Sequence, residues 1–237
     1  AVNPVTGEAL NLTKLDIKGL GKAKYILKEG GTLGDLYTTS NLRFNDNGYV
    51  EVDKNGNLLM TDEGEDIYLG SVFPNHNLAW RNDFSYKGIN LGVLFTARLG
   101  GVCYSATQAN LDLYGVSEAS AAARDAGGVL INGREMVDAQ KWYQAIGSQS
   151  GLPQYYLYSA TNVRLQELSL GYTFPRKWFR NKLGLTVSFV GRNLWMIYCK
   201  APFDPEAVAS TGLNYQGIDY FMMPSMRNLG FNVKFQF

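Results

Sequence analysis

The segment DKNGNLLMTDEGED, which begins at Asp53, carries residue types that bind calcium. Asp53, Asn55 and Asn57 have the spacing of the first three ligands of an EF-hand loop. That loop needs glycine at its sixth position and glutamate at its twelfth, where this segment has Leu58 and Gly64. The EF-hand pattern therefore fails. An irregular calcium site is the alternative that stays open, with the carboxylates of Asp62, Glu63, Glu65 and Asp66.

Residues that could support catalysis are few and poorly spaced. His76 is the single histidine, and Cys103 and Cys199 belong to no CxxC or metal-ligand pattern. A zinc site or a histidine-dependent triad therefore has too few groups to form. The segment GLGK at residues 19–22 lacks the spacing and the hydroxyl residue of a phosphate-binding loop. We therefore expect neither an enzyme nor a bound cofactor.

Aromatic side chains in the long aperiodic segments are candidate contacts for a ligand or a partner protein. Their flat faces suit stacking on sugar rings and equally suit a protein interface. They could instead pack into small cores of the segments themselves, and the sequence leaves these three interpretations open. The candidates, which include one acidic residue, are Trp142, Tyr143, Tyr155, Tyr156, Phe203, Asp204, Tyr215 and Tyr220.

The composition excludes several classes of function. The 237 residues carry 22 Lys plus Arg and 21 Asp plus Glu, so the net charge of +1 gives no reason to expect nucleic acid as a partner. No apolar run approaches the roughly 18 residues of a transmembrane helix. The N-terminal AVNPVTGEALNLTK has no charged region followed by an apolar one, so it does not read as a signal peptide. We expect a processed chain or part of a longer one.

From residue 77 onward, side chains alternate between apolar and polar over long stretches. In INLGVLFTARL, every second residue from Ile89 to Leu99 is apolar. Alternation with period two predicts a strand with two different faces, and more than ten residues is long for a strand in a globular protein. We expect five such antiparallel strands, at residues 77–86, 89–99, 161–174, 182–198 and 229–237.

Two features of these strands favour a transmembrane β-barrel. The alternative is a soluble antiparallel sheet with one solvent-exposed face. The strands are long enough to cross a bilayer at a tilt. Their connections alternate between short (87–88 and 175–182) and long (102–158 and 199–225), as in outer-membrane barrels. Charged residues of the less apolar face would line a watery lumen, and they are Arg81, Asp83, Arg98, Glu167, Arg192 and Lys234.

The terminal strand gives this barrel an orientation. It places Phe237 at the periplasmic end and both long connections outside the cell. The short connection 175–182 then lies on the periplasmic side, where Trp178 and Phe179 with basic neighbours suit an interfacial girdle. Five strands would leave two open edges in lipid, so the remaining strands must come from other residues of the same chain or of a separate chain.

Residues 1–76 are polar and turn-rich, and we expect an extracellular loop region there. Asn47-Gly48 and Asn55-Gly56 predict tight turns, because both residue types accept positive φ, and hence a small hairpin at 48–60. Residues 77–237 are expected to form the C-terminal barrel strands with their long loops.

The long loop after the second of these strands has an alanine-rich portion that predicts one or two short helices. Ser117 and Ser120 are placed to cap the second helix, and Gly127-Gly128 to end it. We therefore expect short helices among the extracellular loops of an all-β chain.

Nine stretches of the sequence carry a family resemblance. They are ARLGG (97–101), SATQANLDLYGVSEAS (105–120), ARDAGGV (123–129), YSATNVRLQELSLGYTFP (158–175), VGRNLWMIY (190–198), KAPFDPE (200–206), STG (210–212), GIDYF (217–221) and PSMRNLGFNVKFQF (224–237). In this order they resemble the C-terminal end of SusC/RagA-type TonB-dependent transporters of the outer membrane. Two upstream stretches, AVNPVTGEALNLT and LKEGGTLGDLY, resemble the loop region that precedes this end in the family.

The resemblance implies a multi-pass barrel of about 22 strands in the outer membrane, of which this chain is roughly the last quarter. It implies an N-terminal plug that couples to TonB, a SusD-like lipoprotein as lid, and glycans or peptides as cargo. It also implies that Phe237 belongs to the signal that the barrel-assembly machinery reads. The alternative function is a surface-exposed or soluble glycan-binding β module that uses the loop aromatics.

Overall fold

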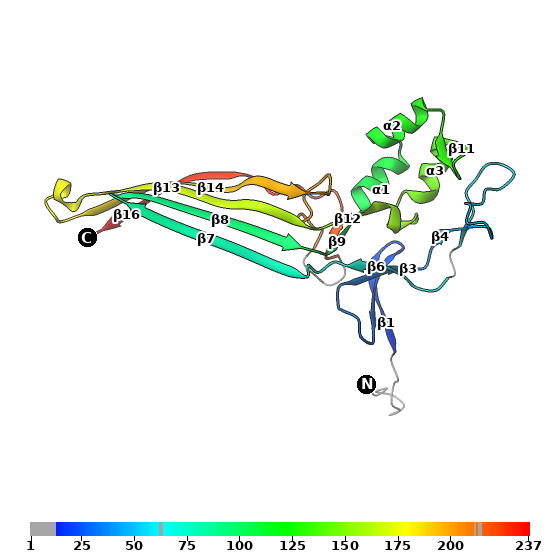
Figure 1. The fold of residues 1–237 in the computed structure, drawn as a ribbon, viewed down its shortest axis with the longest axis horizontal. Coiled ribbons are helices and arrows are strands. Elements are labelled where there is room, and N and C mark those ends of the chain that lie inside the picture. Colours follow the sequence, from blue (N-terminus) through cyan, green and yellow to red (C-terminus); the bar gives the residue numbers. More distant parts are fainter. Residues whose placement is uncertain (1–12, 62–63, 211, 213–214) are drawn as a thin grey trace. The chain divides into compact units, whose positions relative to one another are not determined.

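The computed structural model describes residues 13–61, 64–210, 212 and 215–237, and these form mostly strands with few helices (Figure 1). The chain divides into two compact units. The first consists of Ala1–Phe73, Val102–Tyr158 and Val208–Met222, and the second of Pro74–Gly101, Ser159–Ala207 and Met223–Phe237. Each unit is therefore assembled from segments that are far apart in the sequence.

The second unit is built on one five-stranded antiparallel sheet with the strand order β16-β14-β13-β8-β7 (Figure 1). These strands are the five that the alternating pattern predicted, with ends shifted by at most two residues. Their bounds are β7 His76–Tyr86, β8 Ile89–Leu99, β13 Asn162–Phe174, β14 Gly184–Cys199 and β16 Asn228–Gln236.

The pairing register places most of the large apolar residues of the five strands on one face, whereas Leu94 and Val190 lie on the other. Trp80 lies opposite Phe95, and their rings stack with centroids 5.6 Å apart. At the other end of the sheet, Phe189 lies opposite Phe231 with centroids 5.4 Å apart. Large exposed side chains run across this face and include Leu78, Trp80, Phe84, Tyr86, Ile89, Leu170, Phe189, Leu229, Phe231, Val233 and Phe235. A contiguous apolar surface of this kind needs an apolar environment to cover it.

A β-bulge in β13 keeps this face continuous. The register of β13 shifts between Leu165 and Glu167 against both of its neighbours. Without the extra residue, strict alternation would turn Leu168 to the face opposite Leu165. With it, Leu165 pairs with Phe95 and Leu168 with Val93, so both leucines stay with the apolar side.

The two short connections are tight. The turn between β7 and β8 consists of Lys87 and Gly88, both with positive φ, as a two-residue turn between strands requires. The connection between β13 and β14 contains the 3-10 helix η2 (Arg176–Phe179), followed by Arg180 and Asn181 with positive φ.

The first unit contains a four-stranded sheet that the sequence did not predict. Its order is β1-β2-β3-β6, and its strands are β1 Lys14–Leu20, β2 Ala23–Lys28, β3 Asp35–Thr38 and β6 Ile67–Ser71. Only a small hairpin was expected before residue 76. Inside the predicted range 48–60, an antiparallel bridge joins Val52 and Leu58 across the Asn55-Gly56 turn. A second bridge, Phe44 to Val50, spans the Asn47-Gly48 turn, and outside both turns the strands β4 (Asn41–Leu42) and β5 (Met60–Thr61) pair. Gly48 and Gly56 have the positive φ that their Asn-Gly turns predict.

Three short helices complete the first unit. They are α1 (Ala106–Leu113), α2 (Glu118–Asp125) and α3 (Ala139–Ile146). The predicted cap of α2 is confirmed, since the Ser117 hydroxyl accepts the backbone N–H of Ser120. The helix α3 was not predicted, although Asp138 caps it through the N–H of Lys141. No helix in the described part of the chain is long and apolar enough to cross a membrane.

The remaining elements are short. β9 (Val102–Ser105) pairs in parallel with β15 (Ile218–Asp219), and β12 (Leu157–Ser159) lies on the other side of β9. β10 (Val129–Ile131) and β11 (Glu135–Val137) form a hairpin, and η1 (Pro153–Tyr156) precedes β12. These elements and the helices enclose the buried core of the first unit, whose largest side chains are Tyr25, Leu36, Leu42, Tyr104, Leu152, Tyr156 and Ile218.

Candidate functional site

A ladder of charged side chains crosses the polar face of the five-stranded sheet. Arg192 on β14 donates from Nε to the Glu167 carboxylate on β13, 2.9 Å away. Arg81 on β7 lies 3.7 Å from the other oxygen of Glu167 and 2.9 Å from Asp83 on its own strand. The ladder thus joins three strands through alternating charges. Its two arginines are more than half exposed, so no other described residue covers the ladder.

Gly92 on β8 leaves the space that the side chains of the ladder occupy. A Cβ at Gly92 would lie 2.5 Å from Ser169 Oγ and 2.8 Å from an oxygen of Asp83. The hydrogen atom of glycine leaves that space to the Asp83 carboxylate and the Ser169 hydroxyl.

A chain of neutral hydrogen bonds runs parallel to the charged ladder. Ser85 Oγ donates to Asn90 Oδ1 at 2.7 Å, and Asn90 Nδ2 donates to Thr173 Oγ1 at 2.8 Å. Thr173 Oγ1 lies 3.1 Å from Thr186 Oγ1 on β14. Four strands are therefore linked on this face by side chains as well as by backbone.

All six charged residues that the alternation assigned to one face do share it. Arg81, Asp83, Glu167 and Arg192 form the ladder described above. Arg98 is opposite Asn77 and Asn162, and Lys234 is opposite Thr186, which places both on the polar face by register. That this face lines a lumen stays a prediction.

A buried ion pair ties two segments of the long connection 199–225 to the beginning of β13. The Arg164 guanidinium, 2% exposed, makes a two-pronged contact with the Asp204 carboxylate and donates from Nε to Asn162 Oδ1 at 3.0 Å. Asp204 also accepts the backbone N–H groups of Glu206 (3.0 Å) and Ser225 (3.2 Å) and the Ser225 hydroxyl. We call the side chains of Arg164, Asp204 and Ser225 the latch.

The latch holds Asp204 ionised. Burial raises the pKa of the Asp204 carboxyl, but hydrogen bonds from Arg164, Ser225 and the Glu206 amide outweigh burial and lower the pKa to about 2. Asp204 was a candidate contact for ligand or lid, and its oxygens are instead engaged by this chain. Ser225 and Glu206 were not singled out, because they lie in segments without periodicity. Ser225 in addition reaches Arg164, which lies 61 residues earlier in the chain.

The candidate aromatics before residue 160 mostly pack inside the first unit. Tyr156 is 2% exposed and belongs to the core, and Trp142 and Tyr143 pack against that core. Tyr155 is 41% exposed, and its ring meets Trp142 edge-on with centroids 5.9 Å apart. Of these four, Tyr155 therefore presents the most surface to a partner.

The candidates after residue 200 are more exposed. Tyr215 and Tyr220 are each about two-fifths exposed, and Phe203 is half-buried. The Tyr220 ring meets the ring of Phe221 at 5.4 Å. Phe221 has a positive φ, and its backbone N–H donates to Thr107 Oγ1 at 2.7 Å. A defined hydrogen bond thus holds these two rings at the surface.

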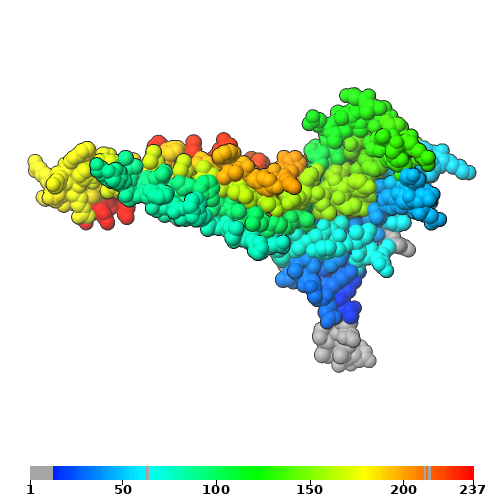
Figure 2. All heavy atoms as spheres, viewed as in Figure 1, coloured from blue at the N-terminus to red at the C-terminus, as the bar shows by residue number. Residues whose placement is uncertain are grey.

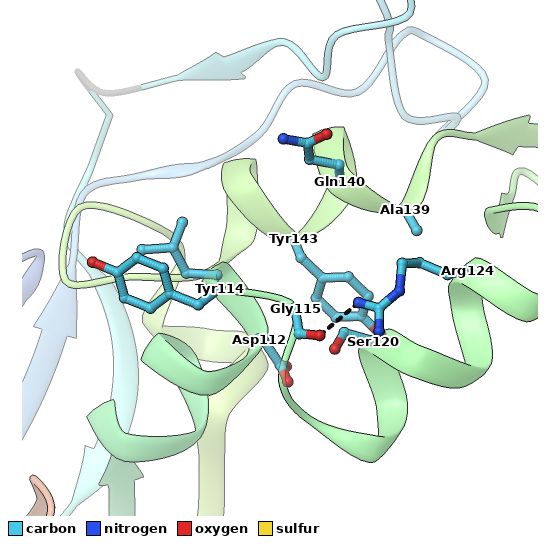
Figure 3. A pocket seen from close by; sticks show the side chains of 9 residues that line it. Asp112, Tyr114, Gly115, Ser120, Arg124, Ala139, Gln140 and Tyr143 are labelled. Carbon is cyan, nitrogen blue, oxygen red and sulfur yellow. Dashed lines mark hydrogen bonds between the residues drawn. The ribbon is translucent and has the colours of Figure 1, made fainter.

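The first unit has a hollow between its helices (Figure 3). Its volume is about 200 Å³, and its lining includes Asp112, Tyr114, Arg124, Gln140 and Tyr143. The Arg124 guanidinium, the one cation of this lining, donates to the Gly115 carbonyl at 2.5 Å, which Figure 3 marks with a dashed line. Ligand pockets usually enclose about 300 Å³ or more, so the hollow is too small for an oligomeric cargo.

The open question of calcium falls partly outside the described residues, because Asp62 and Glu63 lie there. Of the other two carboxylates, Asp66 is paired with Lys14 and Lys28, each at 2.8 Å. These lysines lower the pKa of Asp66 and neutralise the charge that a cation would need. Among the described residues, no group of three or more acidic, histidine or cysteine side chains could hold a metal ion.

Phe237 follows directly after β16 and is 99% exposed. Its ring is therefore open to a partner, which an assembly signal would need to be. That the barrel-assembly machinery reads this ring stays a prediction.

A receptor and a transporter are among the known proteins that this chain resembles. No protein-family model matches the chain. The chain is 26% identical over 198 residues to TonB-dependent receptor P3 of Formosa agariphila, a match that covers 79% of this chain and 19% of that receptor. A chain in the structure of the RagAB peptide transporter superposes with a TM-score of 0.53 and 20% identity, over 94% of this chain and 24% of that one.

The chain therefore spans about a fifth to a quarter of the lengths of the proteins that it matches. Those proteins are named as a receptor and a transporter, not as enzymes. The five-stranded sheet with its two unlike faces and the fold of the RagAB chain agree with the motif resemblance. The similarity of this chain to SusC/RagA-type TonB-dependent transporters is thereby confirmed.

Proposed function

We propose that the chain forms the C-terminal part of the wall of a TonB-dependent importer in the outer membrane. The observation that carries this proposal is the pair of unlike faces on the five-stranded sheet. One face presents a continuous exposed apolar surface, and the other carries ion pairs and hydroxyl groups. Lipid outside and water inside are the surroundings that these two faces match.

Strand length supports the same proposal. A strand that crosses a bilayer at a tilt needs about 9 to 11 residues. The strands β7 and β8 have 11 residues each, and β13, β14 and β16 have 13, 16 and 9.

The edges of the sheet call for more strands. Within the described residues, β7 and β16 each pair with one strand of this sheet. An unpaired backbone group in hydrocarbon costs several kcal/mol. We therefore propose that further strands of the barrel, about 22 in all, close onto both edges. They would come from the same chain or from a separate one, together with the plug through which TonB acts.

The long connections would then lie outside the cell, on the side of the cargo. Their exposed rings, Tyr155, Tyr215 and Tyr220, are available to a SusD-like lipoprotein or to cargo. The RagAB structure is titled as a peptide transporter, and glycans are the other cargo class that the family resemblance implies. We propose an oligomeric nutrient, a glycan or a peptide, as the cargo. We also propose that the exposed Phe237 is read by the barrel-assembly machinery.

The experiment that tests this function is purification of the native product from outer membranes in detergent, followed by intact-mass measurement. We expect a species several times heavier than the 26.3 kDa of this chain, with this sequence inside it. A 26.3 kDa membrane species with co-purifying chains that supply the other strands would support a split barrel. A monodisperse 26.3 kDa protein that stays in solution without detergent would contradict the proposal.

A further inference from the structure

One end of the five-stranded sheet is strongly basic. The two short connections meet there, because the Thr173 N–H donates to the Gly88 carbonyl at 2.7 Å. Figure 1 shows the connection after β13, in yellow, at the end of the sheet beside the turn between β7 and β8. Five exposed cationic side chains lie in these connections, namely Lys87, Arg176, Lys177, Arg180 and Lys182. We call them the basic end.

No Asp or Glu side chain in the described part of the chain neutralises the basic end. Residues 84–90 and 172–184 contain no Asp or Glu. Among the described residues, no carboxylate lies within the 4.0 Å of an ion pair from any of the five cations. The chain as a whole is nearly balanced, with 22 basic and 21 acidic residues. Five positive charges this close together repel one another, and a bound anion would relieve that repulsion.

Aromatic rings mark the level at which these cations lie. Tyr172, Phe174 and Trp178 form a row, with ring centroids 5.0 Å and 5.8 Å apart. Trp178 is 67% exposed, and the row continues the apolar face toward the connection. Trp and Tyr concentrate where a membrane protein passes from hydrocarbon to headgroups. In Figure 2, residues 175–182, in yellow, form the tip of this sheet.

We propose that the basic end binds the phosphate headgroups of anionic lipids in the leaflet on its side of the membrane. This inference rests on the proposed function, because it requires the apolar face to lie in a bilayer. Arginine can hold a phosphate with two parallel hydrogen bonds, and lysine adds a flexible point charge. A lipid surface fits better than an acidic protein segment, because the cations continue directly from the aromatic row and the apolar face.

The test uses the full-length receptor that contains this chain, reconstituted in mixed vesicles of phosphatidylglycerol and phosphatidylcholine. After gentle extraction, native mass spectrometry counts the retained lipids of each kind. The test variant is R176Q/K177Q/R180Q/K182Q. The matched control is K18Q/K24Q/K54Q/K200Q, which removes the same charge from exposed lysines without ion pairs among the described residues.

We expect the unmodified receptor and the control to retain phosphatidylglycerol preferentially. The test variant should lose at least about tenfold of that preference, since each cation near an anionic surface strengthens binding about fivefold. High salt should weaken the preference of the unmodified receptor, a readout that needs no variant. Excess inorganic phosphate tests for a soluble anion, and we expect it to displace little lipid.

Two results would overturn the inference. One is a test variant that sits in the vesicles and retains phosphatidylglycerol as the control does. The other is a basic end whose bound anion is inorganic phosphate or an acidic protein. Failure of the proposed function would give a different result from failure of this inference. The unmodified receptor would then retain neither lipid and would stay in solution without detergent.

Discussion

Replacing Arg164 with Gln should loosen the two loop segments that the latch joins. The Asp204 side chain is 9% exposed and carries a full charge, and Arg164 is its only cation within 3.5 Å among the described residues. The fall in the pKa of Asp204 from 3.8 to about 2 corresponds to roughly 2 kcal/mol in favour of the ionised form. Removing one partner of a buried ion pair costs about 3 to 5 kcal/mol, because the other charge is left uncompensated.

Two backbone amides report directly on this change. The N–H groups of Glu206 and Ser225 both donate to Asp204, from the beginning and the end of the long connection 199–225. Hydrogen exchange measured by mass spectrometry on the receptor in detergent should show these amides exchanging about 100-fold faster in R164Q, as a loss of about 3 kcal/mol requires. Amides in the middle of β14 serve as the internal control, and their exchange should not change.

A second variant distinguishes the effect of the uncompensated Asp204 charge from the effect of losing the contact with Arg164. R164Q/D204N removes the uncompensated carboxylate as well, so part of the lost protection should return. Unchanged exchange at Glu206 and Ser225 in R164Q would refute the latch. A double variant as labile as R164Q would show that a buried charge is not the cause.

Three further predictions concern the sheet and the pH dependence of the latch. Gly92→Ala should lower the unfolding temperature of the receptor, measured by heating samples before gel electrophoresis, because the added Cβ would overlap Ser169 and Asp83 at a cost of about 1 to 3 kcal/mol. Gly230→Ala is the control and should change the unfolding temperature little, because nothing lies within 4 Å of a Cβ at that position. Pepsin should cut the segment that contains Asp204 increasingly fast as the pH falls from about 4 toward 2. The pKa of Asp204 is lower in the folded state than in the unfolded chain, so the stability that the ionised carboxylate gives is present above the unfolded-state pKa and is lost as the pH falls through the folded-state pKa. D204N should show no such pH dependence beyond that of pepsin itself. Phe189→Lys on the apolar face should cost about 2 to 4 kcal/mol in the membrane, whereas Ser188→Lys on the polar face should be tolerated, and equal effects of the two on assembly would contradict the assignment of the faces.

The sequence was most informative where one physical constraint acts along many residues. Each strand of the sheet must separate two environments, so its side chains alternate, and this pattern located all five strands to within two residues. The Ser117 cap and the Asn-Gly turns were also predictable, because each depends on a few neighbouring residues.

The sequence was least informative where contacts join distant segments. The strands β1, β2, β3 and β6 are short, and Leu36 and Tyr37 are buried at adjacent positions, so no alternation distinguishes them from loops. The helix α3 has eight residues, too few for a clear period. The bulge after Leu165 could not be predicted either, because it appears only as a register shift against the neighbouring strands.

The candidate site divides in the same way. The ladder residues were assigned to one face by alternation, and the structure pairs four of the six. The loop residues were chosen by type alone, and that choice did not distinguish Tyr156, which is buried, from Tyr220, which is exposed. Gly92 matters through the space that it leaves, and no residue type or motif in the sequence signals that role.

Single spin labels along β16, in the proposed full-length receptor reconstituted in a bilayer, test most directly whether this sheet separates lipid from water. Labels at Phe231, Val233 and Phe235 should be more accessible to oxygen, which concentrates in lipid. Labels at Gly230, Asn232 and Lys234 should be more accessible to a water-soluble nickel reagent, giving a period of two along the strand. Equal access of the water-soluble reagent to both sets would contradict the claim that this sheet separates lipid from water.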